Sequence, residues 1–204
     1  MRLRITFSKQ GALRYTGHLD LHKLWERAAR RAELPLAYSQ GFHPQPKMNI
    51  AAALPLGFSS RCEVLDMRLE HDIPLDGLQD KLQSTLPTGI RVSAIESVDE
   101  RAPALQTQVT SAEYEVTLTE AVPGSDLKRR IDSVMESDSI IRERRGKTYD
   151  LRPLVEELKL SPDDKIQMRL TAKEGATGRP EEVLDVLGIA FDETRIERTR
   201  LNFL

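Results

Sequence analysis

The chain has 204 residues, of which 39% are hydrophobic and 30% are charged, a balance typical of a folded protein with a polar surface. No run of about 18 apolar residues is present and the N-terminus lacks the apolar core of a secretory signal, so we expect a cytoplasmic protein without membrane contact. The single cysteine, Cys62, excludes an internal disulfide, a cysteine-rich zinc site and an iron–sulfur cluster bound by this chain alone. We expect no cofactor.

The first hundred residues alternate between strand and helix patterns. Residues 2–8 alternate polar and apolar side chains, which predicts a strand. Residues 18–34 repeat apolar side chains at helical spacing until Pro35 interrupts them, which predicts a helix. The same patterns predict strands at 48–54, 61–70 and 90–98 and a helix at 74–89. The predicted order is therefore β-α-β-β-α-β.

The same order of elements repeats after residues 99–112, which have no clear period and are predicted to be a linker. Strands are predicted at 113–119, 140–151 (interrupted at Gly146), 165–173 and 195–204, and helices at 125–137 and 179–188, with a short inserted helix at 152–160. Two β-α-β-β-α-β units in tandem predict an α+β fold of two ferredoxin-like units. We place them at residues 1–100, which contain the predicted binding surface, and 111–204.

Positive charge is concentrated in the first 60 residues, which contain nine basic and three acidic side chains although the formal net charge of the chain is −2. On a helical wheel of residues 18–34, the basic side chains lie away from the apolar stripe and form an outward face that includes Lys23. Such a face can neutralise the phosphates of a nucleic acid, and the alternative is an ordinary solvated face. We assign to an RNA-binding surface the basic residues Arg14, Arg27, Arg30, Arg31 and Lys47.

The stretch SQGFHPQPK, residues 39–47, combines a glycine, two prolines, an aromatic side chain, a histidine and a lysine. Because Pro44 and Pro46 fix two backbone angles and restrict the residues before them, we expect a stiff loop that presents its side chains at defined angles. Aromatic rings can stack on bases and a lysine can meet a phosphate. We therefore add Tyr38, Phe42 and His43 to the RNA-binding residues. The alternative is a connection that Phe42 anchors in the core.

His18 and His22 lie four residues apart, so both rings can reach one point above the helix, and His43 is the potential third member of a site. Leu19 stands where a zincin motif requires glutamate, and we predict no metal site. A histidine pair can also transfer protons during RNA cleavage. We assign His18 and His22 to RNA binding and commit to no catalytic residue; the alternative is a catalytic set of His18, His22 and His43.

A second basic run follows at residues 142–152 and includes Tyr149. On a strand, Arg142 and Arg144 share one face. We assign Arg142, Arg144 and Arg145 to the RNA-binding surface. The alternative is a sheet edge that charge protects against aggregation.

Three stretches resemble a known family: FSKQGALRYTGHLDL (7–21), ERAARRAELPLAYSQGFHPQPKMNIAAALPLG (26–57) and CEVLDMRL (62–69). Together they resemble the radical-SAM-linked protein family, a domain of unknown function typically encoded beside, or fused to, a B12-binding radical SAM protein. The resemblance extends to YDLRPLV (149–155), and Gly17 and Gln45 depart from the expected pattern. It implies a radical SAM partner and a connection to RNA metabolism, and it brings no catalytic residue with it.

These observations predict an accessory RNA-binding protein that presents tRNA or rRNA to a radical SAM enzyme and catalyses no reaction by itself. One alternative is a metal-independent RNA endonuclease with a histidine acid–base site. Tandem ferredoxin-like units resemble the CRISPR RNA-processing endonucleases, although this likeness concerns the fold alone. Another alternative is a protein-interaction module that docks the radical SAM partner without RNA.

Overall fold

The structure is a computed structural model that describes residues 1–120 and 122–204. It separates into two compact units, Met1–Gln108 and Val109–Leu204, and the boundary falls inside the predicted linker. Both units combine antiparallel strands with helices, so the predicted α+β class is confirmed. No helix among the described residues combines the length and the apolar character that a bilayer span requires.

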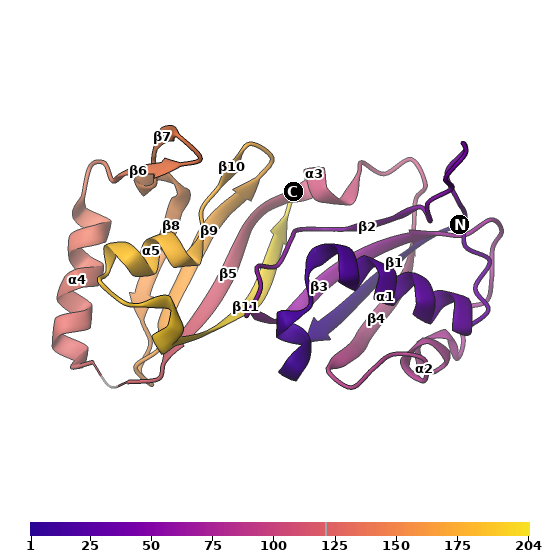
Figure 1. The fold of residues 1–204 in the computed structure, drawn as a ribbon, viewed down its shortest axis with the longest axis horizontal. Coiled ribbons are helices and arrows are strands. Elements are labelled where there is room, and N and C mark those ends of the chain that lie inside the picture. The colour runs from indigo at the N-terminus through magenta and orange to yellow at the C-terminus, as the bar shows by residue number, and fades with distance from the viewer. Residues whose placement is uncertain (121) are drawn as a thin grey trace. The chain divides into compact units, whose positions relative to one another are not determined.

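The first unit has the predicted order of elements (Figure 1). Its elements are β1 (Arg2–Lys9), α1 (His18–Arg31), β2 (Met48–Ile50), β3 (Ser59–Arg68), α2 (Leu78–Gln83), β4 (Ile90–Val98) and the short α3 (Leu105–Gln108). A 3₁₀ turn over Gly11–Tyr15 precedes α1. The strands pair antiparallel in the order β4-β1-β3-β2. The two strands joined through α1 are thus separated in the sheet by β3.

The core of this unit lies between the sheet and its helices. Alternate side chains of β1 are fully buried, as its period of two requires. Phe7 of β1 meets Trp25 of α1 edge to face, with 4.8 Å between the ring centroids. Leu78 and Leu82 of α2 belong to the same buried cluster. The apolar stripe of α1 therefore fixes the helix on the sheet and leaves its basic face outward.

A buried ion cluster joins β1, β3 and the segment before α3. Asp66 accepts hydrogen bonds from Arg2 Nε at 2.8 Å and from Arg4 Nε at 2.9 Å. Arg2 also donates to the carbonyls of Ala102 and Pro103, at 2.8 and 2.9 Å. Only 3% of the Asp66 side chain and 4% of the Arg2 side chain are exposed. The single carboxylate thus compensates two guanidinium groups.

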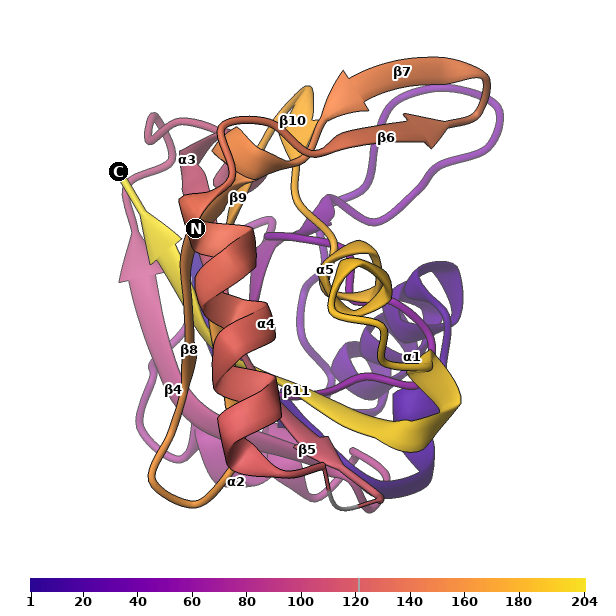
Figure 2. The ribbon, with the colours of Figure 1, turned by 90° about the vertical axis from the view of Figure 1, so that its left-hand side faces the viewer.

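The second unit contains a sheet in the order β11-β5-β9, with β8 on the far side of β9 and all pairings antiparallel. Figure 2 shows α4 in front of β8, and the β6–β7 hairpin above α5. The elements are β5 (Val109–Leu118), α4 (Gly124–Glu136), β6 (Ile141–Arg144), β7 (Lys147–Asp150), β8 (Val155–Leu160), β9 (Ile166–Lys173), β10 (Ala176–Thr177), α5 (Pro180–Val186) and β11 (Thr194–Phe203). The two-residue β10 pairs with the end of β9.

Two predictions for the second unit were wrong. Residues 152–160 were predicted to be a helix, but a 3₁₀ turn over Arg152–Leu154 leads into strand β8. The pairing of β8 with β9 shifts between Val155 and Glu157, so Val155 and Leu158 are both buried at a spacing that imitates a helix.

Residues 140–151 were predicted to be one interrupted strand and instead form a hairpin, β6–β7. Arg145 and Gly146 both have positive φ, 51° and 73°, as a two-residue turn of type I′ requires.

Several boundaries in the first unit also differ from the predictions, and strands β1 and β3 differ from theirs by one and two residues. Strand β2 covers only the first three residues of the predicted strand 48–54. The predicted helix 74–89 begins only at Leu78, because Gly77 adopts a left-handed conformation with φ 70°. The predicted helix 18–34 ends at Arg31, and Glu33 follows with φ 52°. Strand β4, by contrast, has the predicted bounds.

Candidate nucleic-acid interface

The outward face of α1 presents four exposed cations, Lys23, Arg27, Arg30 and Arg31. Arg30 lies 3.8 Å from Glu26, and Arg31 donates to the carbonyl of Thr85 at 3.3 Å. Neither Lys23 nor Arg27 has a hydrogen bond or an ion pair with any residue that the structure describes. These two charges therefore remain available to an anionic ligand. Lys23 was not among the predicted RNA-binding residues, but it lies on the same face of α1 as Arg27, Arg30 and Arg31.

This face forms one wall of a groove of about 550 Å³. The residues that follow α2 form the other wall, and Gln83 of α2 donates to the carbonyl of Ile90 in β4 at 3.0 Å. Thr85 Oγ1 donates to the carbonyl of Ala28 at 3.1 Å, which links the two walls. The groove is lined by Asp20, Lys23, Leu24, Arg27, Arg31, Thr85, Leu86 and Pro87. The groove thus combines Lys23 and Arg27, unpaired within the described part of the chain, with the apolar side chains of Leu24, Leu86 and Pro87.

The 39–47 loop is stiff at its base and exposed at its tip. The backbone N–H of Ser39 donates to the carbonyl of Gln45 at 2.8 Å. In return, the backbone N–H of Gln45 donates to Ser39 Oγ at 2.9 Å. Phe42 is fully exposed, so the alternative in which it anchors the loop in the core is wrong. Tyr38 is half-buried and packs on the core, whereas His43 and Lys47 are exposed.

The loop and the groove emerge at opposite edges of the first sheet. The loop leads into β2, the edge strand beside β3, whereas the groove lies beside α2, which is bound to β4 at the other edge. Figure 1 shows the loop and α2 on different sides of α1. The structure therefore does not merge the predicted loop residues and the α1 cations into one continuous patch.

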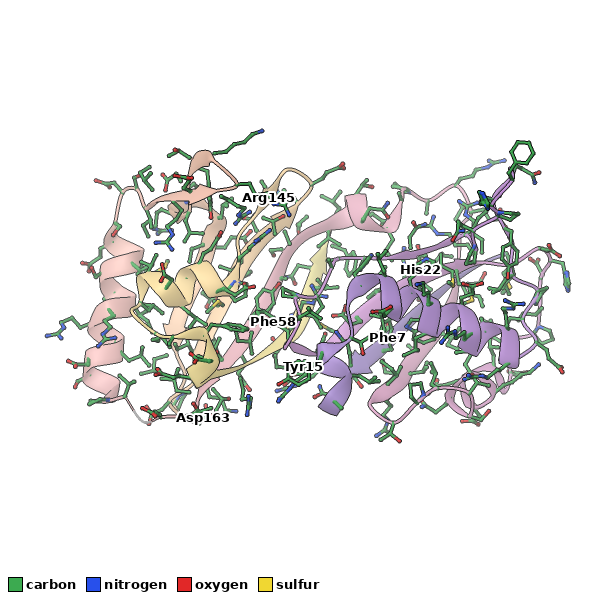
Figure 3. All side chains as sticks on the ribbon, in the orientation of Figure 1. Phe7, Tyr15, His22, Phe58, Arg145 and Asp163 are labelled. Atoms are coloured by element: carbon green, nitrogen blue, oxygen red, sulfur yellow. The ribbon has the colours of Figure 1, made fainter. Side chains whose placement is uncertain are left out.

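The three histidines of the alternative catalytic set have different surroundings. His18 is exposed in the first turn of α1, and His43 is exposed on the loop. His22, labelled in Figure 3, is half-buried, and its Nε2 lies 3.2 Å from the carbonyl oxygen of Met48 in β2. Across residues 1–120 and 122–204, no three histidine, cysteine or acidic side chains gather into a group that could bind a metal. The structure thus shows no metal-ligand group of these histidines.

Arg14 lies in the 3₁₀ turn before α1 and is half-buried. Its guanidinium is 4.7 Å from the ring centre of Tyr15, and its Nη2 lies 2.8 Å from the Tyr15 hydroxyl. Tyr15 is 62% exposed and is labelled in Figure 3. The Arg14–Tyr15 pair is therefore a second surface feature beside the start of α1, and Tyr15 was not among the predicted site residues.

Two of the three arginines assigned to RNA binding in the second unit are paired with acids of α5. Arg144 donates from Nε to Glu182 at 2.9 Å, and its guanidinium lies 4.7 Å from the centre of the Tyr149 ring. Arg142 forms an ion pair with Asp185. Arg145 is exposed at the hairpin turn (Figure 3). Arg142 and Arg144 thus fasten the β6–β7 hairpin to α5, which supports a structural role for both.

The link between Arg144 and Glu182 is expected to weaken in acid. Burial acts to raise the pKa of Glu182, but hydrogen bonds from Arg144 and Tyr149 outweigh it and hold the pKa below its usual value of 4.5. The carboxylate therefore stabilises the hairpin fully above about pH 4.5, and this contribution is lost as the pH falls through the lowered pKa. Glu182→Gln should destabilise the hairpin by about 1.5–3 kcal/mol at about pH 6, with little difference from the native chain in strong acid.

Hydrogen-exchange protection of residues 141–150 measures this difference. Glu174→Gln removes an exposed carboxylate from the turn between β9 and β10 and should leave protection unchanged. Equal protection in Glu182→Gln and the native chain at about pH 6 would contradict the role of this ion pair.

The chain was compared with solved structures, with curated proteins and with models of protein families. A chain in the solved structure titled "Crystal Structure of a Cbf5-Nop10-Gar1 Complex" has 10% sequence identity and a TM-score of 0.46, and the match covers 98% of this chain and 48% of that chain. This chain thus spans about half the length of that protein. A comparison with curated proteins finds no match. The family model described as "Uncharacterized protein conserved in bacteria (DUF2344)" matches residues 2–180, and the chain therefore belongs to this family.

Proposed function

We propose that this chain is an accessory RNA-binding protein and that the basic face of α1 contacts the RNA phosphates. The observation that supports this most directly is that Lys23 and Arg27, which have no partner among the residues that the structure describes, share one groove with Arg31. Cations that already neutralise a neighbouring acid contribute less to a ligand, whereas unpaired ones release counterions from a phosphate backbone. The predicted residues Arg14, His18, His22 and Arg30 lie on the same helix or in the turn before it.

The proposed RNA is tRNA or rRNA, and the proposed partner is a radical SAM enzyme. Both follow from the resemblance in residues 7–21, 26–57 and 62–69. The 39–47 loop, with Phe42 exposed on a stiff base, is proposed as a second point of contact with RNA. Arg145 is the exposed arginine of the second basic run that remains in this proposal.

Each unit is proposed to be ferredoxin-like. The strand orders β4-β1-β3-β2 and β11-β5-β9-β8 both place the first strand between the third and the fourth strand of a β-α-β-β-α-β unit. In the second unit the β6–β7 hairpin is an insertion between α4 and β8.

The histidine endonuclease receives no support from the described geometry, because His22 faces the Met48 carbonyl and His43 is exposed on the loop. The alternative of a protein-interaction module can be distinguished from an RNA-binding protein by one measurement, the salt dependence of RNA affinity. The RNA-binding proposal thus makes the sharper prediction.

The test measures the affinity of the full chain for bulk tRNA at increasing salt. Replacing Lys23 and Arg27 together by alanine should weaken binding and reduce the slope of log K against log salt by roughly 1.4–1.8, since each phosphate contact contributes about 0.7–0.9. The matched control replaces Lys128 and Arg129 of α4, which are paired with Asp132 and Asp126, and should leave the slope unchanged. An unchanged slope in the Lys23/Arg27 variant would refute the proposal.

A further inference from the structure

We infer that the groove beside α1 is a site for one nucleotide of the bound RNA, with the phosphate beside Arg27 and Arg31 and the base toward Asp20. This inference rests on the proposed RNA binding and deepens it, because it names the part of the RNA that enters the groove. The remainder of the backbone would run over the exposed cations outside the groove.

The size and lining of the groove fit a nucleotide better than an extended phosphate track. Its volume of about 550 Å³ lies in the range of about 300–1,000 Å³ that small-molecule sites occupy. A phosphate track needs only a row of cations, but this groove also contains Leu24, Leu86 and Pro87. An apolar wall contributes nothing to phosphate binding, whereas it can cover the face of a base or a ribose.

The charges along the groove determine which end of it receives the phosphate and which end receives the base. Asp20, Lys23, Arg27 and Arg31 follow one another along one side of α1, and with a rise of about 1.5 Å per residue Asp20 lies roughly 10 Å from Arg27 along the axis. The Asp20 carboxylate repels a phosphate and can only accept hydrogen bonds. No hydrogen bond or ion pair of Asp20 occurs within the described part of the chain. It is therefore suited to a base that carries an amino group.

The walls of the groove are fixed before any ligand binds. The hydroxyl of Thr85 donates to the carbonyls of Ala28 in α1 and Leu82 in α2, at 3.1 and 2.8 Å. Thr85 is thus connected to both helices. The hydrogen bond from Arg31 to the Thr85 carbonyl, at 3.3 Å, holds this guanidinium against the wall. A preformed site binds with a smaller loss of entropy than a site that must be ordered.

The experiment titrates the full chain with AMP, with purine riboside 5′-monophosphate, which is AMP without the amino group, and with inorganic phosphate, and follows the backbone amides by NMR. AMP should shift the amides of residues 20–31 and 84–86 and bind roughly fivefold more tightly than purine riboside 5′-monophosphate, as one additional hydrogen bond implies. Arg27→Ala should weaken AMP binding at least roughly tenfold, since a hydrogen bond to a charged group is lost. Lys128→Ala, outside the groove, should bind AMP like the native chain.

Asp20→Ala tests the orientation separately from affinity. This variant should bind AMP and purine riboside 5′-monophosphate equally, because the proposed acceptor of the amino group is absent. Two results would overturn the inference: phosphate binding as tightly as AMP, or AMP leaving the groove amides unshifted. If either occurs while the Lys23/Arg27 variant still loses its salt slope with tRNA, RNA binding stands and only the nucleotide site fails.

Discussion

Replacement of Asp66 by alanine is expected to destabilise the first unit by about 3–5 kcal/mol, the cost of breaking a buried ion pair by removing one partner. The carboxylate accepts hydrogen bonds from both Arg2 and Arg4, and only 3% of its side chain is exposed. Without it, the guanidinium group of Arg2 would remain buried without its ion pair, and Arg4 would keep only the charge of Glu96 opposite it on β4. The hydrogen bond with Asp66 raises the pKa of Arg4, which agrees with a strong preference for the charged form.

Urea denaturation followed by tryptophan fluorescence measures this loss, because Trp25 is the one tryptophan of the chain and belongs to the core of the first unit. Asp66→Asn keeps the shape of the side chain and removes its charge, so its loss should be smaller than that of Asp66→Ala. Asp76→Asn changes an exposed aspartate beside α2 and should shift the free energy by less than about 0.5 kcal/mol. Equal midpoints for the Asp66 and Asp76 variants would show that the cluster does not stabilise the unit.

Local periodicity predicted most elements because it reports which side chains are buried. The alternation in residues 90–98 located β4 to the residue, and the stripe in residues 18–34 located α1. The same reasoning failed for β8, where a register shift placed buried side chains three apart, as a helix would. It also missed the β6–β7 hairpin, because its turn uses Arg145 rather than the asparagine or aspartate that usually signals type I′.

The candidate site was less predictable because it depends on contacts between distant residues. The basic face of α1 could be read from residues 18–34, but the opposite wall comes from Thr85, which is 57 residues from Ala28 along the chain. Similarly, the sequence pattern assigned Arg142 and Arg144 to the RNA-binding surface, because their partners, Asp185 and Glu182, lie about 40 residues away along the chain. A one-dimensional pattern shows which residues are charged, and only the fold shows which charges are already compensated.

The packing of α1 on the sheet, on which the groove depends, leads to the second large expected effect. Trp25→Ala should destabilise the first unit by about 3–5 kcal/mol, because it empties a fully buried site and removes the edge-to-face contact with Phe7. Trp25→Phe should recover most of this loss. It retains an aromatic ring against Phe7, and it removes the indole N–H, which is buried without a hydrogen-bond partner in the described structure.

Urea denaturation followed by far-UV circular dichroism compares these variants, since both lack the tryptophan signal. Leu19→Ala is the matched control on the same helix: Leu19 is 75% exposed, and its loss should change the free energy of unfolding by less than about 0.5 kcal/mol. If Trp25→Ala and Leu19→Ala unfold at the same urea concentration, the contact with Phe7 does not fix α1. If Trp25→Ala also loses tRNA affinity while Trp25→Phe retains it, binding depends on α1 being seated on the sheet, because only a seated helix places its cations beside Thr85, Leu86 and Pro87.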